Sequence, residues 1–414
     1  MKVGIVLYPT YGGSGVVATE LGKALAAKGH EIHFITYSQP VRLGSFRENI
    51  FYHEVSLTDY PLFDFQPYET QLASKMVDVV KHEKLDILHV HYAIPHASAA
   101  FMAQQILKAQ GIEIPFVTTL HGTDITLVGK DPSFEPVITF CINHSDAVTT
   151  VSESLKNDTY AHFQVTRDIH VIPNFVVEDA EDEHYTVYMR QKYASDGERI
   201  LCHISNFRPV KRVDDVLRVF AKVNAELPSK LILVGDGPDR YHCERLCREL
   251  NLCDQVIFLG KVRDTSHVLE MADVFLLPSE TESFGLAALE AMAVGVPVIS
   301  SNTEFNKHIT KDFKDYWLAS GGQINIFQSD EGDIKSQINE SDMIFIAADA
   351  EQARLTRSAL PNSIPTFGLS QIYSGEPTNA DNLPLKGVRF VDLPWMVDRG
   401  NPKFAAYKEA SADL

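Results

Sequence analysis

The sequence predicts an α/β protein with two parallel-sheet domains in succession. Short apolar runs alternate with helical patterns, and buried strands separated by helices indicate parallel neighbours joined by crossovers. The alternation starts again after residue 198. The length of 414 residues suits two or three domains of about 100–200 residues each.

The first half of the chain contains six predicted strands. A helix is predicted at Val16–Lys28, where Gly29 follows the last turn and is typical of a helix end. The strands are Val3–Tyr8, Glu31–Tyr37, Ile87–His91, Phe116–Leu120, Ala147–Val151 and His170–Ile172. We predict a first domain over residues 1–176, followed by a polar, strandless linker over 177–198.

The second half repeats the pattern over residues 199–303. Helices are predicted at Val213–Glu226 and Ser283–Val294. The strands are Arg199–Ile204, Lys230–Val234, Gln255–Leu259, Val274–Pro278 and Val298–Ser300. This segment predicts a second α/β domain of the same kind.

Residues 304–414 differ from the rest in composition. All five cysteines and fifteen of sixteen histidines precede residue 304, and both tryptophans follow it. The segment also reads as α/β, with a helix at Ala350–Leu360. Its strand-like runs are Gln323–Phe327, Met343–Ala347, Thr366–Leu369 and Val388–Val391. The composition change predicts a different origin for the last quarter of the chain.

The overall charge and the cysteines narrow the class of protein. A net charge of −18 argues against a general binder of nucleic acid or anionic membrane. No apolar run is long enough for a membrane span or a signal-peptide core, and the cysteines lack paired spacing. We therefore expect a cytoplasmic protein without stable membrane insertion, and we expect Cys243 and Cys247 to be unligated thiols. A homo-oligomer is left open.

A glycine loop, Tyr11–Gly15, separates the first predicted strand from the first helix. Glycines let a ligand approach the backbone closely, and a helix N-terminus offers N–H groups to an anion. The spacing differs from the GxGxxG pattern of nicotinamide-binding proteins. A tight strand–helix turn without a ligand is the alternative.

Two histidine motifs follow predicted strands. His89–Tyr92 ends one strand, and Leu120–Asp124 ends another, where ligands of open α/β sheets bind. A zinc site is disfavoured, since no third ligand has the spacing to complete it. The alternative is that His89 and His121 are ordinary hydrogen-bonded histidines.

A basic motif, Ser205–Arg212, opens the second predicted domain. It follows a strand, starts a helix and carries three cations, which suits a clamp for phosphate groups. A solvated helix start is the alternative. The nearby Gly235–Pro238 is by itself only a turn signal.

Two glutamates, Glu282 and Glu290, frame the last predicted helix of the second domain. Eight residues turn about 800° at the helical period, so we expect the two carboxylates within about 80° of each other around the axis. Carboxylates at such a place can accept ribose or sugar hydroxyls. Surface charge is the alternative, which the apolar helix beside them weakens.

These motifs together resemble a known enzyme family. The stretches Tyr8–Gly15, His89–His96 and Thr118–Gly129, with the E-x7-E element at Glu282 and Glu290, are similar to nucleotide-sugar glycosyltransferases of family 4. The match is closer to the branch that transfers N-acetylglucosamine to L-malate in the bacillithiol pathway. The resemblance covers residues 1–303 and implies the GT-B fold, in which two Rossmann-like domains face a cleft.

The resemblance also implies the reaction. UDP-N-acetylglucosamine would bind mainly to the second domain and L-malate to the first. The sugar would pass to the malate hydroxyl with retention at the anomeric carbon and without an obligatory metal. The leaving phosphate would take the acceptor proton, while basic side chains and backbone N–H groups stabilise its growing charge.

The resemblance assigns roles to individual residues. The residues expected at the reacting groups are His121, Glu282, Arg208 and Lys211. Donor contacts are expected from Gly13, Asn206, Arg208, Lys211, Glu282, Phe284, Gly285, Leu286 and Glu290. Acceptor contacts are expected from Gly12, Gly13, Ser14, Tyr92 and Thr123. Within these sets Glu290 would bind the ribose, and Glu282 the sugar hydroxyls.

The chain departs from the family in two places. Many relatives carry arginine five residues before the clamp lysine, where this chain has Asn206, and we expect Arg208 to substitute. After Thr303 the glycine-glycine pattern of the relatives is missing, and Glu304–Lys307 follows. We therefore expect the second domain to be incomplete.

The last segment resembles a different family. From about residue 312 the chain is similar to a fragment of the lipoprotein activators of penicillin-binding proteins, which have a periplasmic-binding-protein-like domain. The motifs are Tyr316-Trp317, Gly321-Gly322, Ser341–Arg354 and Val391–Trp395. We favour a joined or misassembled reading frame with a junction at about 303–312. The alternatives to the malate-directed enzyme are a non-catalytic chimeric scaffold and a family 4 enzyme with another acceptor.

Overall fold

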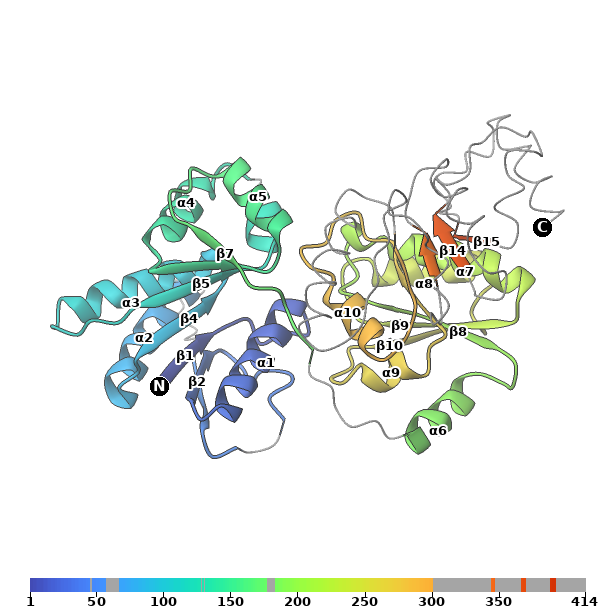
Figure 1. The fold of residues 1–414 in the computed structure, drawn as a ribbon, viewed down its shortest axis with the longest axis horizontal. Helices are drawn as coiled ribbons and strands as arrows, with labels where there is room; N and C mark the ends of the chain where they lie inside the picture. Colours follow the sequence, from blue (N-terminus) through green and yellow to red (C-terminus); the bar gives the residue numbers. More distant parts are fainter. Residues whose placement is uncertain are drawn as a thin grey trace, which may run out of the picture.

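The computed structural model describes residues 1–44, 47–56, 67–127, 129, 131–176 and 183–300, together with three strands near the C-terminus. We call the described residues up to 176 the first lobe and residues 183–300 the second lobe. Each lobe is a parallel sheet flanked by helices, and the two lie side by side (Figure 1). This confirms the predicted fold class.

The first lobe has a seven-stranded sheet in the order β3-β2-β1-β4-β5-β6-β7, with every pair parallel. The strands are β1 (Lys2–Val6), β2 (Glu31–Thr36), β3 (Ile50–Glu54), β4 (Ile87–His91), β5 (Phe116–Leu120), β6 (Ala147–Thr150) and β7 (Ile169–Val171). The helices are α1 (Gly13–Ala27), α2 (Tyr68–Glu83), α3 (Ser98–Lys108), α4 (Glu135–His144) and α5 (Glu153–His162), with short helical turns at Ala93–Ala97 and Thr123–Leu127.

The strand β3 was not predicted from the sequence. It lies at the edge of the sheet, and none of its residues is fully buried. An edge strand with half-exposed histidine, tyrosine and glutamate lacks the continuous apolar run that marks the central strands. The six predicted strands of this lobe are all present, with ends shifted by one or two residues.

The second lobe has a five-stranded parallel sheet in the order β10-β9-β8-β11-β12. The strands are β8 (Arg199–Ile204), β9 (Ser229–Val234), β10 (Val256–Gly260), β11 (Val274–Leu277) and β12 (Val298–Ser300). The helices are α6 (Glu183–Tyr193), α7 (Val213–Glu226), α8 (Arg240–Glu249), α9 (Ser266–Glu270) and α10 (Leu286–Ala293), with a 3₁₀ turn at Pro209–Lys211. Helix α6 occupies part of the predicted linker.

A shared hydrophobic cluster joins the lobes. Leu120 and Val151, at the ends of β5 and β6, belong to the same buried cluster as Phe284 and Ala288 of the second lobe. Burying apolar surface from both lobes stabilises their contact by about 25 cal/mol for each Å² removed from water. The carboxyl ends of β5 and β6 are therefore packed against the start of α10.

The C-terminal strands β13 (Ile344–Ile346), β14 (Thr366–Leu369) and β15 (Val388–Val391) form a parallel sheet of their own in the order β13-β14-β15. Three of the four strand-like runs predicted there are thus present. The predicted strand Gln323–Phe327, the predicted helix Ala350–Leu360 and the departure at Glu304–Lys307 lie outside the described residues. Within the described part of the chain, no helix is long and apolar enough to cross a membrane.

Candidate active site

The glycine loop lies between β1 and α1, as predicted. Gly12 is the N-cap of α1. A Cβ added at Gly15 would lie 2.5 Å from the Tyr8 carbonyl oxygen, so the tight turn admits no side chain there. A Cβ added at Gly13 would lie 3.8 Å from Cδ2 of Leu286, the first residue of α10. The loop therefore meets the second lobe at its sugar-nucleotide motif.

Three of the predicted acceptor residues converge on one hydroxyl group. The Tyr92 hydroxyl donates a hydrogen bond of 2.6 Å to Oγ of Ser14. It also has a side-chain hydrogen bond with Thr123. Burial raises the pKa of Tyr92, so the hydroxyl stays protonated at neutral pH. The glycine loop, the end of β4 and the turn after β5 thus supply a polar surface from three separate motifs.

The strand-end histidines are bonded to each other and to a threonine. Nε2 of His89 lies 2.7 Å from Oγ1 of Thr119, which is the ordinary hydrogen-bonded reading of that residue. Nδ1 of His91 lies 2.7 Å from Nε2 of His121. Burial lowers the pKa of His121 to about 3, so its ring is neutral at pH 7. A neutral ring can donate one hydrogen bond and accept another, and it does not repel a cationic transition state.

Asp124 is a structural residue to which sequence reasoning gave no role. Its buried carboxylate accepts hydrogen bonds from the backbone N–H groups of Ala93 (2.9 Å), Gly122 (3.1 Å) and His121 (3.3 Å). Burial is the largest influence and raises the pKa of Asp124 to about 6, against those N–H groups, which lower it. Asp124 ties the loop after β4 to the loop after β5. The sequence feature that could have pointed to Asp124 was its place in the Leu120–Asp124 motif.

Gly122 lies close to Ser283 of the second lobe. Its φ is +106°, and a Cβ added there would lie 1.7 Å from Oγ of Ser283 in the second lobe. Ser152 adds a hydrogen bond of 2.7 Å from its hydroxyl to the Ser283 carbonyl. Only glycine fits this position, because both the backbone conformation and the available space exclude a side chain.

The second lobe places its basic motif beside Glu282. The Lys211 ammonium group lies 2.5 Å from Oε1 of Glu282. The same oxygen accepts a hydrogen bond of 2.7 Å from the Ser279 hydroxyl. The backbone N–H of Glu280 donates to the Val210 carbonyl, which holds the two loops together. Two predicted site residues from distant motifs therefore form one ion pair.

The turn after β9 packs against the basic motif Ser205–Arg212. Gly235 has a φ of +125°, and a Cβ there would lie 1.7 Å from the Ser205 carbonyl oxygen. Phe207 is fully buried, whereas Asn206 and Arg208 on either side are exposed. The charge of Arg208 acts on the pKa of Tyr92, so the guanidinium group lies near the predicted acceptor residues of the first lobe.

Glu290 is paired with a residue that the sequence did not point to. Nη1 of Arg42, in the first lobe, lies 2.8 Å from Oε1 of Glu290. Thr265 donates a 3.3 Å hydrogen bond to the other carboxylate oxygen and accepts one of 3.1 Å from Arg42. Arg42 lies in a turn after β2 without any recognisable motif, and its partner is 248 residues away. No signal in one sequence could have found it.

The predicted geometry around Glu282 and Glu290 needs a correction. Helix α10 begins at Leu286, and Gly285 before it has a left-handed backbone with φ of +77°. The stretch between the two glutamates is therefore not continuously helical, and the helical rotation does not relate them. Each glutamate has its own cationic partner instead. Phe284 is buried in the shared core, so its side chain packs and does not face solvent.

Comparison with known proteins agrees with this geometry. Residues 11–180 match the model for Glycosyltransferase Family 4, and residues 187–329 match the model for Glycosyl transferases group 1. The second match runs beyond the predicted junction at about 303–312. The chain is 51% identical over 302 residues to the N-acetyl-alpha-D-glucosaminyl L-malate synthase of Bacillus anthracis, covering 73% of this chain and 78% of that protein. These comparisons do not support the second resemblance, to the lipoprotein activators.

More distant proteins share the fold. An uncharacterized glycosyltransferase of Methanocaldococcus jannaschii is 28% identical over 320 residues, which is 73% of this chain and 80% of that protein. The crystal structure of Anabaena HepE with UDP and glucose has a TM-score of 0.58 at 18% identity, covering 74% of this chain and 82% of that one. The structure of WaaG, a lipopolysaccharide glycosyltransferase, has the same TM-score at 16% identity over 75% and 84%.

The predicted glycosyltransferase class is therefore confirmed, by the high identity to one relative and by the architecture. The chain belongs to the family 4 glycosyltransferases of the GT-B fold.

Proposed function

We propose that this glycosyltransferase moves N-acetylglucosamine from UDP-N-acetylglucosamine to the hydroxyl of L-malate. The observation that carries the proposal is the 51% identity to a synthase named for this product. The identity spans both lobes, and the residues that would receive malate converge at Tyr92 beside the donor motif.

The donor would bind mainly to the second lobe. As the bond between the anomeric carbon and the phosphate oxygen breaks, negative charge grows on the leaving diphosphate. Lys211 and Arg208 supply positive charge to stabilise that diphosphate, with Asn206 beside them. Glu282, held by Lys211 and Ser279, accepts hydrogen bonds from sugar hydroxyls. The backbone at Gly285 and Leu286 completes the donor site, facing Gly13 of the first lobe.

The acceptor would bind to the first lobe. Gly12, Gly13 and Ser14 present the start of α1 to a malate carboxylate. The Ser14 hydroxyl accepts a hydrogen bond from Tyr92 and donates its own proton to malate, while Tyr92 and Thr123 line the same site. The malate oxygen bonds to the anomeric carbon on the face that the phosphate leaves. Its proton passes to the departing phosphate oxygen, which gives retention without a separate base. The neutral His121 would lie beside the reacting centre and orient the sugar through Nδ1, because its Nε2 is paired with His91.

Glu290 would bind the uridine ribose. Both of its oxygens are engaged, one by Arg42 and the other by Thr265. A carboxylate has acceptor sites for about four hydrogen bonds, so ribose hydroxyls can share it with Arg42. Arg42 then positions Glu290 and links the lobes at the same time.

The reaction is proposed to run in the cytoplasm and to need no metal. All five cysteines are free thiols, which suits a reducing compartment. Cationic side chains take the place that a divalent ion has in metal-dependent transferases. Addition of EDTA to the assay should leave the initial rate of UDP release unchanged, and an EDTA-sensitive initial rate would contradict this part.

The test is an assay of UDP release from purified full-length protein. We expect release with UDP-N-acetylglucosamine and L-malate together, and none above background with either alone. Replacing malate with D-malate, or with an amino sugar or lipid acceptor, should abolish release. If UDP were released only with another acceptor, that compound would be the substrate in place of malate. If folded protein released no UDP, the proposal would be overturned for this chain.

A pair of variants ties the activity to the site. Glu282→Gln removes the charge that Lys211 holds, and we expect a loss in kcat of about 100-fold, the size typical of one lost transition-state contact. Glu280→Gln changes an exposed acid two residues away and should keep full activity. Equal losses in both variants would contradict the assigned role of Glu282.

We also propose that the chain beyond residue 329, where the family match ends, has a different origin from the enzyme. The support is the change in composition and the separate C-terminal sheet β13-β14-β15, which does not extend the five-stranded sheet of the second lobe. We therefore propose a junction nearer the C-terminus than the 303–312 expected from the sequence. Sequencing the gene across codons 300–330 tests this, since an uninterrupted frame in independent isolates would exclude an assembly break.

A further inference from the structure

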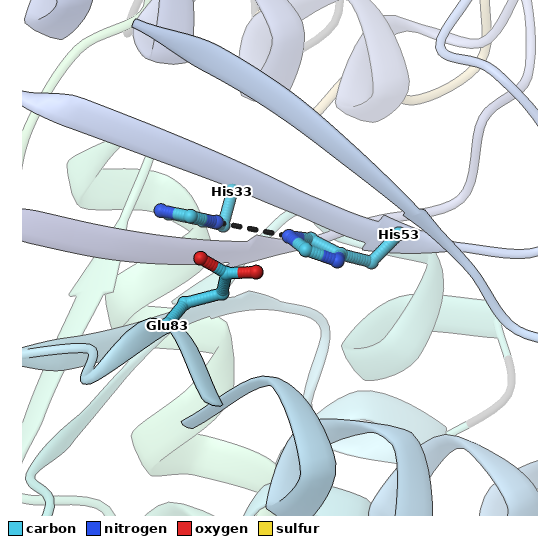
Figure 2. Close-up of side chains that lie close together, drawn as sticks. All are labelled: His33, His53 and Glu83. Carbon is cyan, nitrogen blue, oxygen red and sulfur yellow. Dashed lines mark hydrogen bonds between the residues drawn. The ribbon is translucent and has the colours of Figure 1, made fainter. Parts of the chain in front are cut away.

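Three metal-ligating side chains converge in the first lobe, outside the candidate active site. His33 comes from β2, His53 from β3 and Glu83 from the last residue of α2 (Figure 2). One ligand atom from each lies within 4.8 Å of the others. His33 is fully buried, and His53 and Glu83 are half-buried.

The fold explains why the three side chains meet. His33 is directly opposite Phe51 in the parallel pair β2–β3, and His53 is two residues further along, so both histidines point to the same face. Helix α2 covers that face, with Met76 and Val79 packed in the same cluster as Ile35 of β2. The helix ends at Glu83, which brings its carboxylate over the two rings (Figure 2).

The Glu31 carboxylate determines which ring nitrogen of His33 carries the proton. Nε2 of His33 lies 3.0 Å from Oε1 of Glu31, and Glu31 is held by Lys2 at 2.5 Å. The Nε2 nitrogen therefore carries the proton and donates it to Glu31, while Nδ1 offers its lone pair toward His53, 2.9 Å away. A histidine whose outer N–H is bound by a carboxylate is the arrangement that orients histidines in metal sites.

We propose that His33, His53 and Glu83 form a site for Zn²⁺. Nδ1 of His33, Nε2 of His53 and one oxygen of Glu83 are the three protein ligands, and water takes the fourth position. Two imidazoles with one carboxylate suit Zn²⁺, whereas Mg²⁺ and Ca²⁺ prefer oxygen ligands alone. The neutral His53 carries its proton on Nδ1 when the metal is bound, so no proton has to leave the two rings.

The geometry needs only a small adjustment. Tetrahedral zinc with nitrogen ligands at about 2.0–2.1 Å separates those nitrogens by about 3.3 Å. The 2.9 Å contact between the two rings must therefore open by about 0.4 Å, which a rotation of the half-buried His53 supplies. The Glu83 side chain closes the remaining distance by changing rotamer.

A metal at this site would stabilise the edge strand β3 of the sheet. Strand β3 pairs with β2 alone among the described strands, so its outer edge has no partner there. A metal bound to β2, β3 and α2 joins this strand to the lobe at three points. None of the three ligands is among the residues proposed to bind donor or acceptor, so we expect UDP release not to depend on the bound metal.

The experiment is a titration of metal-free, full-length protein with Co²⁺, followed by its visible absorption, and then with Zn²⁺ as competitor. We expect the intense absorption of four-coordinate Co²⁺ at one equivalent per chain and its loss on adding one equivalent of Zn²⁺. We also expect Zn²⁺ to raise the melting temperature of the wild type. A weak, six-coordinate Co²⁺ spectrum would overturn the proposal.

Three variants locate the ion. Glu83→Gln should weaken Zn²⁺ binding at least tenfold, and Glu31→Gln should weaken it by about 10- to 100-fold through His33. His82→Ala removes an exposed neighbouring histidine, which pairs with Asp78, and should bind Zn²⁺ as the wild type does. Wild-type affinity in Glu83→Gln, or an equal loss in His82→Ala, would overturn the assignment. UDP release measured on the same samples separates this outcome from the proposed function.

Discussion

The two lobes approach their common boundary with different chemistry. Apart from Arg42, which pairs with Glu290, the first lobe presents neutral groups, namely the hydroxyls around Tyr92 and a buried His121 whose pKa lies far below neutrality. The second lobe presents charges, with Lys211 paired to Glu282 and an exposed Arg208. Charge that develops on a leaving diphosphate is best met by fixed cations, and a small hydroxyl acceptor by oriented dipoles. This difference is what the proposed binding of the acceptor to the first lobe and the donor to the second requires.

The largest effect should come from the charged side. Lys211→Ala removes a cation proposed to stabilise the diphosphate and releases Glu282, so we expect kcat to fall by about 100- to 1000-fold. The measurement is UDP release at saturating donor. Lys222→Ala, an exposed lysine on α7, is the matched control and should keep wild-type kcat. If both variants lose activity to the same degree, charge at the site is not the cause.

The contact between the lobes should be nearly as sensitive. Gly122→Ala would force a Cβ to within 1.7 Å of Oγ of Ser283, so the lobes must separate and UDP release should fall by more than tenfold. The positive φ adds a cost of about 1–2 kcal/mol to folding. Gly111→Ala isolates that cost, because Gly111 also has a positive φ but nothing lies within 4 Å.

A second substitution separates crowding from general damage. Ser283→Gly removes the atoms that the new Cβ would meet, so the double variant Gly122→Ala/Ser283→Gly should regain most of the lost UDP release. A double variant as inactive as Gly122→Ala would mean that the close approach of the lobes is not what limits activity.

Buried histidines should make both lobes sensitive to acid. Burial lowers the pKa of His96 in the first lobe and His203 in the second to about 4. Below pH 6.5 the unfolded chain binds protons that the folded chain excludes. The unfolding free energy should therefore fall by about 1.4 kcal/mol per pH unit for each such histidine, from pH 6.5 down to about 4. Asp124 opposes this trend, because its raised pKa lets the folded chain bind a proton near pH 6.

Denaturant unfolding at several pH values tests whether the unfolding free energy falls as the pH is lowered. His203→Gln should reduce the slope of unfolding free energy against pH by about 1.4 kcal/mol per unit, as should His96→Gln. Because the lobes share a core, we expect one transition. A transition that splits on acidification would show that the lobes unfold separately.

The smallest effect should come from the ion pair that crosses the boundary. Arg42→Ala frees Glu290 from its partner in the first lobe, and we expect the KM for UDP-N-acetylglucosamine to rise by about 3- to 10-fold, the size of one partly buried contact. The value of kcat should change little. A lower KM would mean that Arg42 competes with the ribose and does not position Glu290.

The sequence predicted the fold and some of the contacts between the candidate site residues, for identifiable physical reasons. Central strands are continuous apolar runs, so β1, β8 and β12 were placed within two residues at each end. Strand-end motifs such as Ser205–Arg212 lie where open sheets bind ligands, and the structure brings Lys211 to Glu282.

The features that the sequence did not predict depend on contacts between distant segments of the chain. The pairing of Arg42 with Glu290 and the three N–H groups gathered by Asp124 arise only after the lobes dock and the loops fold. The exposed edge strand β3 has no apolar periodicity, so neither it nor the convergence of His33 with His53 was foreseen.

The approach of Gly122 to Ser283 has a consequence for how this family varies. Neither position can change freely, because any side chain at the first needs space that the second occupies. Among aligned relatives the two positions should covary across the boundary, with a residue other than glycine at the first accompanied by glycine at the second. The residues found at these two positions would then indicate which relatives bring their lobes as close together as this chain does.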